Sequence, residues 1–285
     1  MSELIGKELG LYQILEYISA GGMSTVYKAY HAALDRHVAV KVLPAQTGLE
    51  QELRQRFQQE VRTIARLQHA HILPIFDYGQ EDGQLYLVMR LIEHGSLADR
   101  IRRGSMSVEE IDRVIHQVGD ALSYAHSQGI VHRDVKPSNV LIDAQGNCYL
   151  SDFGLAKTMQ ASIRFTATGV GLGTPAYMSP EQGKGEAVDT RSDVYSLGAM
   201  LYEMVTGQVP YQADTPLAVM LKHITAPVPL PSRIRPDLSP ALEQVIVIAL
   251  AKEPDQRFQT VAQMVDAFEG AILRNSMPIV VPPPP

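Results

Sequence analysis

The most informative residues lie in the short stretch from His132 to Asn139 and in Asp152, which follows thirteen residues later. Asp134 could accept the proton of a hydroxyl group, and Lys136, two residues on, could meet a phosphate. Asn139 and Asp152 offer the oxygen ligands that a hard divalent cation prefers. Asx turns and helix N-caps explain one such aspartate equally well, because Asp and Asn favour those places. They do not explain four groups at these spacings, which together suit phosphoryl transfer.

This pattern resembles the catalytic-loop and metal-loop signature of protein kinases. The chain is similar to the catalytic domain of bacterial eukaryotic-like (Hanks-type) Ser/Thr protein kinases, with motifs from about Ile18 to Arg257. The resemblance implies that Asp134 accepts or orients the proton of the substrate hydroxyl and that Lys136 contacts the γ-phosphate of ATP. Asn139 and Asp152 would hold Mg²⁺ or Mn²⁺.

The nucleotide has further predicted contacts upstream. Lys41 ends the run Val38-Ala39-Val40-Lys41, which resembles the third-strand lysine motif that pairs with the α- and β-phosphates. Glu60 lies beside the apolar stripe of the helix that follows and matches the acidic partner of this lysine. A lysine or a glutamate alone would normally be solvated, so these assignments depend on the order of the motifs.

The phosphate-covering loop departs from the family pattern. Ser19 and Ser24 stand where the first and third glycines of G-x-G-x-x-G usually lie, and Gly21 is retained. Glycine allows backbone N–H groups to approach a phosphate, so serine should narrow the accessible geometry. By resemblance, Met89 is the gatekeeper, and the backbone of residues 90–92 forms the hinge, with Arg90 where an acidic residue is common. The predicted nucleotide site comprises Ile18, Ser19, Gly21, Val26, Ala39, Lys41, Met89, Arg90, Ile92 and Leu141.

Residues 152–181 resemble an activation segment that closes in Ser179-Pro180-Glu181. Thr174 matches the threonine that contacts the catalytic Asp and Lys of Ser/Thr kinases, and Lys136 points to the same class. Glu181 and Arg257 resemble the buried pair that anchors the segment. Asp193 resembles the acid that braces the catalytic loop.

Arg133, directly before Asp134, suggests regulation by phosphorylation. Kinases with an arginine there often pair it with a phosphorylated loop residue, and a phosphothreonine adds about −1.5 to −2 charge. Thr166 and Thr168 lie eight and six residues before Thr174 and are the predicted phosphosites. They could equally be polar loop residues without a regulatory role.

The elements that must position these residues follow from hydrophobic periodicity. Five short strands are predicted at 12–18, 25–30, 38–43, 72–78 and 85–89, with a helix at about 49–68. Ser107 and Glu110 form a capping-box pattern before a helix that ends near Gly129, and residues 140–151 read as a hairpin. Further helices are predicted at 193–205, 216–225, 239–252 and 260–273.

These elements predict an α+β, bilobal protein-kinase fold. The small lobe would be an antiparallel β lobe with one main helix, and the large lobe would be mostly helical. The expected domains are the N-lobe at 1–89, the hinge at 90–95, the C-lobe at 96–274 and a proline-rich linker at 275–285.

Composition restricts the function further. The 285 residues carry a net charge of −6, which argues against a nucleic-acid-binding protein. The single cysteine, Cys148, cannot form an internal disulfide, so nothing requires an oxidising compartment. We see no signal peptide and no apolar run long enough to span a membrane, so the chain is expected to be cytoplasmic. The terminal linker predicts that the full-length protein continues into a membrane anchor after residue 285.

Three functions fit the motifs to different degrees. The leading interpretation is an active Ser/Thr protein kinase that acts on protein substrates and activates itself by autophosphorylation, with a homodimer for phosphorylation in trans. The alternative is a nucleotide-binding pseudokinase or scaffold, which only Ser19 and Ser24 favour. A small-molecule kinase of related fold is disfavoured by residues 173–181, which form a peptide-docking platform in protein kinases.

Overall fold

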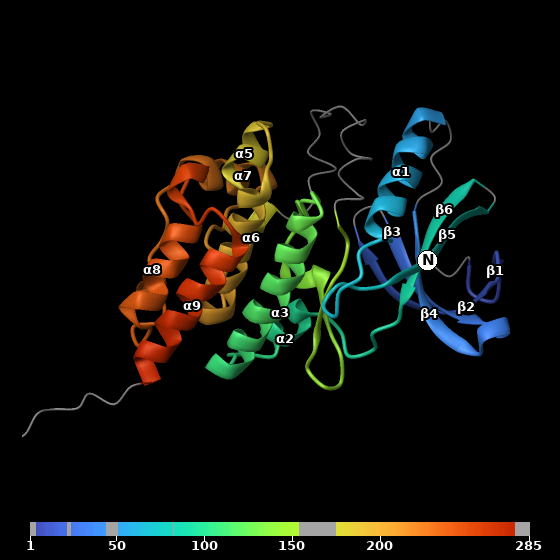
Figure 1. The fold of residues 1–285 in the computed structure, drawn as a ribbon, viewed down its shortest axis with the longest axis horizontal. Coiled ribbons are helices and arrows are strands. Elements are labelled where there is room, and N and C mark those ends of the chain that lie inside the picture. The colour runs from blue at the N-terminus through green and yellow to red at the C-terminus, as the bar shows by residue number, and fades with distance from the viewer. Residues whose placement is uncertain (1–3, 22–23, 44–50, 82, 154–174, 277–285) are drawn as a thin grey trace, which may run out of the picture. The chain divides into compact units, whose positions relative to one another are not determined.

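The computed structural model describes residues 4–21, 24–43, 51–81, 83–153 and 175–276, shown in Figure 1. The chain forms two compact units. Unit 1 contains the residues up to Gly95 and a second stretch that begins at Leu141, and unit 2 contains Ser96–Val140 and the remaining C-terminal part. The first boundary between the units, after Gly95, falls at the end of the predicted 90–95 hinge. The stretch that begins at Leu141, which was predicted to be part of the C-lobe, instead belongs to the β-rich unit 1. The predicted lobe boundaries stay a prediction.

Unit 1 is built on a six-stranded antiparallel sheet with the order β1-β2-β3-β4-β6-β5. Its strands are β1 (Glu8–Leu9), β2 (Tyr12–Gly21), β3 (Ser24–His31), β4 (Arg36–Val42), β5 (Ile75–Glu81) and β6 (Gln84–Arg90). Alternating side chains of these strands, such as Ile14, Ala29, Val38 and Val40, form one buried apolar core. The helix α1 (Gln51–Ile64) lies beside the sheet, as Figure 1 shows.

The prediction of five strands was one short. The additional strand β1 pairs Glu8 with Gln13 and Leu9 with Tyr12. It turns into β2 through Gly10, whose φ of 58° lies in the left-handed region that glycine adopts without strain. Because β1 has only two residues, no periodic pattern could reveal it.

The hairpin of β7 (Val140–Ile142) and β8 (Cys148–Leu150) confirms the predicted one. Asp143 shapes its turn by accepting backbone N–H bonds from Gln145 at 3.0 Å and Asn147 at 2.8 Å. β8 is tied to unit 1 through Leu150, whose N–H donates to the carbonyl of His71 and whose carbonyl accepts from the N–H of Leu73. These bonds carry Asp152, two residues further on, into unit 1.

Unit 2 is helical, as predicted. Its helices are α2 (Leu97–Arg102), α3 (Val108–Ser127), α5 (Pro180–Lys184), α6 (Thr190–Thr206), α7 (Pro216–Thr225), α8 (Pro240–Ala249) and α9 (Val261–Ser276). Ser107 caps α3 in a capping box with Glu110, which confirms the predicted start. The short helices α2 and α5 were not predicted, because six and five residues are too few for a periodic stripe.

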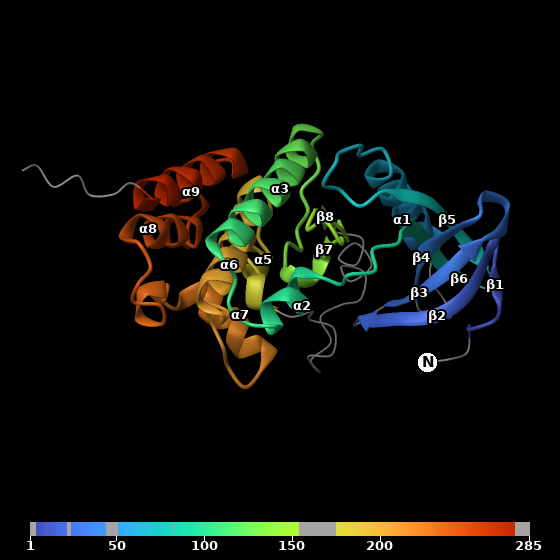
Figure 2. The ribbon, with the colours of Figure 1, turned by 90° about the horizontal axis from the view of Figure 1, so that it is seen from below.

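The helix α6 is the core of unit 2. It is buried along almost its whole length, and α3, α8 and α9 pack against it (Figure 2). At Gly198 a Cβ atom would lie 2.6 Å from the Cβ of Ala249, so only glycine permits this approach of α6 and α8. Among the residues that the structure describes, no helix combines the length and apolarity needed to cross a membrane.

Candidate active site

The backbone of the catalytic loop is held in place by Asp193, which projects from the first turn of α6. Its carboxylate is fully buried and accepts the N–H groups of His132 and Arg133, both at 2.8 Å. The Nε2 atom of His126, at the end of α3, lies 2.8 Å from the same carboxylate. Arg133 has a φ of 66°, a conformation that costs a non-glycine residue about 1–2 kcal/mol. The bonds to Asp193 compensate for part of this strain.

Three of the predicted catalytic and metal residues meet in this loop. Lys136 Nζ lies 2.8 Å from the Oδ2 atom of Asp134. Asn139 is buried, and its Nδ2 group donates to both the carbonyl and the Oδ2 atom of Asp134, at 2.8 and 3.1 Å. Pro137 starts a 3-10 turn that brings Asn139 back towards Asp134. The loop therefore presents one carboxylate that is oriented by a cation and an amide.

The remaining polar groups lie in unit 1, where Lys41 is paired with Asp152 and not with its predicted partner. Lys41 Nζ lies 2.7 Å from Asp152 Oδ1, and both side chains are partly exposed. Among the described residues no ion pair joins Lys41 to Glu60, and the buried Oε2 atom of Glu60 has no hydrogen-bond partner there. The hydrogen-bonded attachment of β8 to the His71–Leu73 segment places Asp152 within reach of β4, where Lys41 lies. The roles of Lys41 in binding phosphate and of Glu60 as its acidic partner stay predictions.

An apolar cluster stands at the predicted adenine site. Ala39 and Met89 are directly opposite each other on β4 and β6 and form its buried centre with Leu73 and Tyr149. Of the predicted residues, Val26, Ile92 and Leu141 pack against this centre. Ile18 is 43% exposed and is not part of it.

Two residues of this cluster were missed in the sequence. Tyr149 lies on β8, its hydroxyl donates to Asp143 at 3.0 Å, and the guanidinium of Arg90 stacks on its ring at 4.8 Å. Leu73 precedes β5. Both residues lie far in sequence from β4 and β6 and approach these strands only in the folded chain. The sequence shows them only as apolar residues next to other elements, which does not predict this contact.

A small cavity adjoins the cluster within unit 1. Its lining combines side chains of the sheet and α1 with the residues that follow β8, namely Ile64, Leu73, Ile75, Leu87, Met89, Ser151, Asp152 and Phe153. Phe153 is 3% exposed. Asp152, with a φ of 64°, thus sits in a strained backbone conformation between a buried phenyl ring and Lys41.

The predicted phosphate-covering loop is the end of the β2–β3 hairpin. Ser19 is paired with Val26, and Gly21 with Ser24. A register shift between Tyr17 and Ser19 bends β2 before this end. The serines that replace the two glycines are therefore accommodated as paired strand residues, while residues 22 and 23 lie outside the described part.

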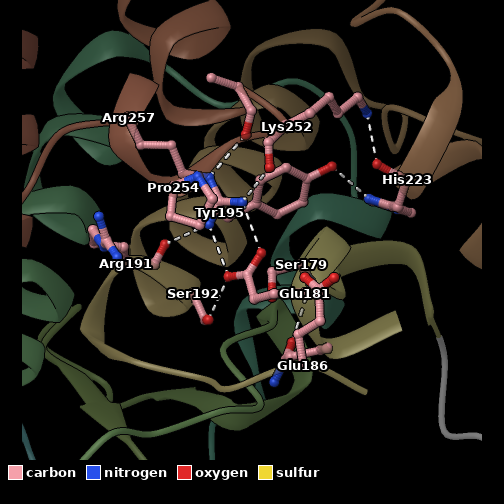
Figure 3. Close-up of polar contacts among 12 residues, drawn as sticks. Ser179, Glu181, Glu186, Arg191, Ser192, Tyr195, His223, Lys252, Pro254 and Arg257 are labelled. Atoms are coloured by element: carbon pink, nitrogen blue, oxygen red, sulfur yellow. Dashed lines mark hydrogen bonds and ion pairs between the residues drawn. The ribbon is translucent and has the colours of Figure 1, made fainter. Parts of the chain in front are cut away.

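The predicted anchor of the activation segment is present in unit 2 (Figure 3). Arg257 donates to both carboxylate oxygens of Glu181, at 2.9 and 2.8 Å, and Ser192 donates to one of them. The guanidinium also donates to the carbonyls of residues 191, 251 and 252 and stacks on the ring of Tyr195 at 4.9 Å. Burial alone would raise the pKa of Glu181, but the bonds from Arg257 and Ser192 lower it to about 2. Glu181 is therefore ionised at neutral pH.

Three predicted residues cannot be placed. Thr166, Thr168 and Thr174 lie outside the described residues, so their proposed roles stay predictions. His126 and Ser192, in contrast, were not singled out in the sequence and contact Asp193 and Glu181. A histidine near a helix end and a serine on a buried helix face carry no signal of such a contact.

Comparison with known proteins identifies the family of this chain. Residues 12–268 match the family model described as protein kinase domain. The chain is 36% identical to the serine/threonine-protein kinase PknH of Mycobacterium tuberculosis over 99% of its own length and 47% of that protein. It is 39% identical to the serine/threonine-protein kinase PrkC of Bacillus subtilis over 92% of its own length and 40% of that protein.

The fold agrees as well. The crystal structure of the M. tuberculosis PknI kinase domain aligns with a TM-score of 0.76 and 30% identity, over 94% of this chain and 98% of that one. This chain spans less than half the length of PknH and PrkC, so it corresponds to only part of such proteins. With the family model covering most of its length, the chain belongs to the protein kinase domain family.

Proposed function

We propose that this chain transfers the γ-phosphate of ATP to serine or threonine hydroxyls of proteins. The observation that carries the proposal is the oriented carboxylate of Asp134, with Lys136 Nζ and Asn139 Nδ2 at 2.8 and 3.1 Å from its Oδ2 atom. An aspartate without such partners would be solvated. The loop that carries Asp134 is instead fixed by the buried Asp193, which accepts the backbone N–H groups of His132 and Arg133. Such preorganisation is what phosphoryl transfer requires from a protein.

In the proposed reaction, Asp134 accepts the proton of the substrate hydroxyl. The hydroxyl oxygen forms a bond to the γ-phosphorus, and the bond between that phosphorus and the β–γ bridging oxygen breaks, so that ADP leaves with the bonding electrons. Lys136, 2.8 Å from Asp134, would move its charge towards the transferred phosphoryl group. A correctly positioned general base typically contributes about 10²–10⁴-fold to the rate.

ATP and a divalent metal are used generally in this family, and we propose Mg²⁺ or Mn²⁺ for this chain. Asp152 of unit 1 offers a carboxylate oxygen and Asn139 of unit 2 an amide oxygen, and both are ligand types that a hard cation prefers. The metal would neutralise charge on the phosphates. Lys41 would contact the α- and β-phosphates, for which its ion pair with Asp152 must loosen, and Glu60, whose Oε2 atom is buried, would then become its partner.

We also propose that the kinase activates itself. Arg133 is exposed directly before the base, where a phosphothreonine could pair with it. Thr166 and Thr168 are the proposed acceptors, and a homodimer would allow transfer in trans. Mass spectrometry of the protein after incubation with ATP would identify the modified residue.

A transfer assay tests the proposal. Purified protein is incubated with γ-labelled ATP, Mg²⁺ and a generic basic protein, and label on either protein is counted. We expect transfer by the wild type, a loss of at least about 100-fold in Asp134→Asn, and wild-type activity in Asp112→Asn, a partly exposed aspartate of α3. Transfer that survives Asp134→Asn would contradict the proposed role of Asp134.

The pseudokinase alternative has one observation in its favour. Lys41 is paired with Asp152 and the Oε2 atom of Glu60 is left without a partner, so the phosphate and metal groups of unit 1 are not arranged for transfer. A protein of this kind would be stabilised by ATP in a thermal-shift measurement and would transfer no label in the same buffer. That combination would replace the kinase proposal.

A further inference from the structure

A glutamine that follows the anchor of the activation segment contacts the catalytic loop. Gln182 lies in α5, and its Oε1 atom accepts the N–H of Ser179, the N-cap residue of this helix, at 3.1 Å. Its Nε2 group donates to the carbonyl of Arg133 at 2.8 Å. One amide thus joins the backbone of the segment end to the peptide unit that precedes Asp134.

The orientation of this amide is fixed by its partners. A backbone N–H can only donate and a carbonyl can only accept, so the oxygen of Gln182 must face Ser179 and its nitrogen must face Arg133. Only an amide side chain serves both. A glutamate at 182 keeps the acceptor and loses the donor, and a methionine loses both.

The bond to Arg133 reaches the most strained point of the loop. Arg133 has a φ of 66°, and its N–H is held at 2.8 Å by Asp193. Gln182 holds the carbonyl of the same residue, so this strained residue is fixed from both sides. Rotation of the Arg133–Asp134 peptide would swing the Cβ of Asp134, and a shift of about 1 Å at a reacting group can cost about 100-fold in rate.

The other end of the bridge is rigid. Glu181, the neighbour of Gln182, is 4% exposed and is bound by two nitrogens of Arg257 and by Ser192. Pro180 begins α5 and restricts its first turn. The position of the Gln182 backbone is therefore set by this anchor (Figure 3 shows Glu181 and its partners).

We infer that Gln182 is a positioning residue for Asp134, through which the anchored end of the activation segment holds the catalytic loop in its strained conformation. The inference rests on the proposed role of Asp134 as the base. Gln182 contacts the loop backbone and is assigned no contact with substrate. Its loss should therefore lower kcat and leave the binding of ATP unchanged.

Gln263 supplies a matched control. Its Oε1 atom accepts the N–H groups of Gln259 and Thr260, at 2.9 and 3.3 Å, and so caps the start of α9 much as Gln182 caps α5. Gln263→Glu makes the same chemical change in the same unit and in a similar capping role. The two substitutions differ in the donor bond to the catalytic loop.

The experiment compares Gln182→Glu, Gln182→Met and Gln263→Glu with the wild type. For each protein we would measure kcat, the KM for ATP, the melting temperature and hydrogen exchange of the backbone in residues 132–139. In both Gln182 variants we expect kcat to fall about 10- to 100-fold with the KM for ATP within about twofold. Exchange at residues 132–139 should become faster in both, while Gln263→Glu matches the wild type in kcat and in exchange.

The outcomes distinguish a failure of the positioning role of Gln182 from a failure of the proposed kinase function. Unchanged kcat and unchanged exchange in the Gln182 variants would overturn the positioning role, as would equal losses in Gln263→Glu. If the wild type transfers no label, the proposed kinase function fails, and the exchange comparison still decides whether Gln182 holds the loop. If Gln182→Glu does not fold, Gln182→Met, which adds no charge but also removes the cap, is compared with Gln263→Met, which removes the cap of α9 in the same way.

Discussion

The two units differ in how their polar site residues are held. In unit 2 the carboxylate of Asp134 belongs to a network in which the buried Asp193 fixes the backbone and Asn139 and Lys136 orient the side chain. In unit 1 Lys41 is paired with Asp152, and the buried Oε2 atom of Glu60 has no partner among the described residues. The catalytic loop around Asp134 is preorganised, whereas Lys41 and Asp152, which are proposed for the phosphates and the metal, must exchange partners.

This difference indicates where regulation can act. A preorganised loop needs no rearrangement at the moment of reaction. Substitutions that disturb such a loop should therefore lower both the free energy of unfolding and the rate of transfer. An ion pair that must be broken for function does not need to contribute to stability, and substitutions there should affect the rate alone. Measurements of the free energy of unfolding should therefore distinguish substitutions in unit 2, which lower it, from substitutions in unit 1, which do not.

The largest effect is expected at Asp193. Asp193→Ala removes the acceptor of the buried N–H of His132 and of the part-buried N–H of Arg133, and a buried group left unpaired costs about 1–3 kcal/mol. We expect a loss of about 3–5 kcal/mol in the free energy of unfolding, measured by urea titration, together with a loss of transfer activity. The control is Asp189→Ala at the N-cap of the same helix, which should cost about 1 kcal/mol. Similar losses in both variants would show that Asp193 is an ordinary helix residue.

The second prediction concerns acid stability in unit 2. Burial lowers the pKa of His223 from 6.5 to about 4, and the nearby charge of Lys252 adds to this shift. Between pH 4 and 6.5 the unfolded chain therefore binds the proton that the folded chain does not, so this contribution is complete above pH 6.5 and is lost as the pH falls towards 4. The stability difference should reach about 3 kcal/mol over that range.

The test is the pH dependence of unfolding in His223→Asn. The asparagine oxygen can still accept the hydroxyl of Tyr195, which lies 2.8 Å from His223 Nδ1, but it does not titrate. The variant should lose less stability than the wild type between pH 6.5 and 4. Parallel curves for the two proteins would mean that the pKa of His223 is the same in the folded and the unfolded state. Hydrogen exchange by region would show whether the loss begins in unit 2.

The smallest change in stability is expected at Glu60. Because its Oε2 atom is buried without a partner, Glu60→Gln removes an uncompensated charge and should lower the unfolding free energy of the nucleotide-free protein by less than about 0.5 kcal/mol, or raise it. The rate of transfer should nevertheless fall about tenfold or more, since the proposed partner of Lys41 is weakened. Glu110→Gln is the contrasting variant, because both oxygens of Glu110 bind Arg100, at 2.7 and 2.6 Å. A loss above about 1 kcal/mol in Glu60→Gln would show that Glu60 is already paired in solution.

Much of the fold could be predicted from local patterns. The five longer strands, the capped helix α3 and the buried helix α6 follow from periodicity and capping residues, which depend on neighbours a few positions away. The two-residue strand β1 and the short helices α2 and α5 could not be predicted, because their few residues carry no periodic signal. They form where longer elements provide hydrogen bonds and an apolar surface.

The sequence by itself determined the kinase family and the identity of the polar groups, since Asp134, Lys136, Asn139 and Asp152 stand in a linear motif. It also pointed to the pair of Glu181 and Arg257. Only the tertiary structure decided the partners: Lys41 with Asp152, Gln182 with the carbonyl of Arg133, and Tyr149 in the apolar cluster. A motif specifies which groups are available along the chain. Which groups meet depends on distances between segments far apart in sequence, and packing and long-range hydrogen bonds set those distances.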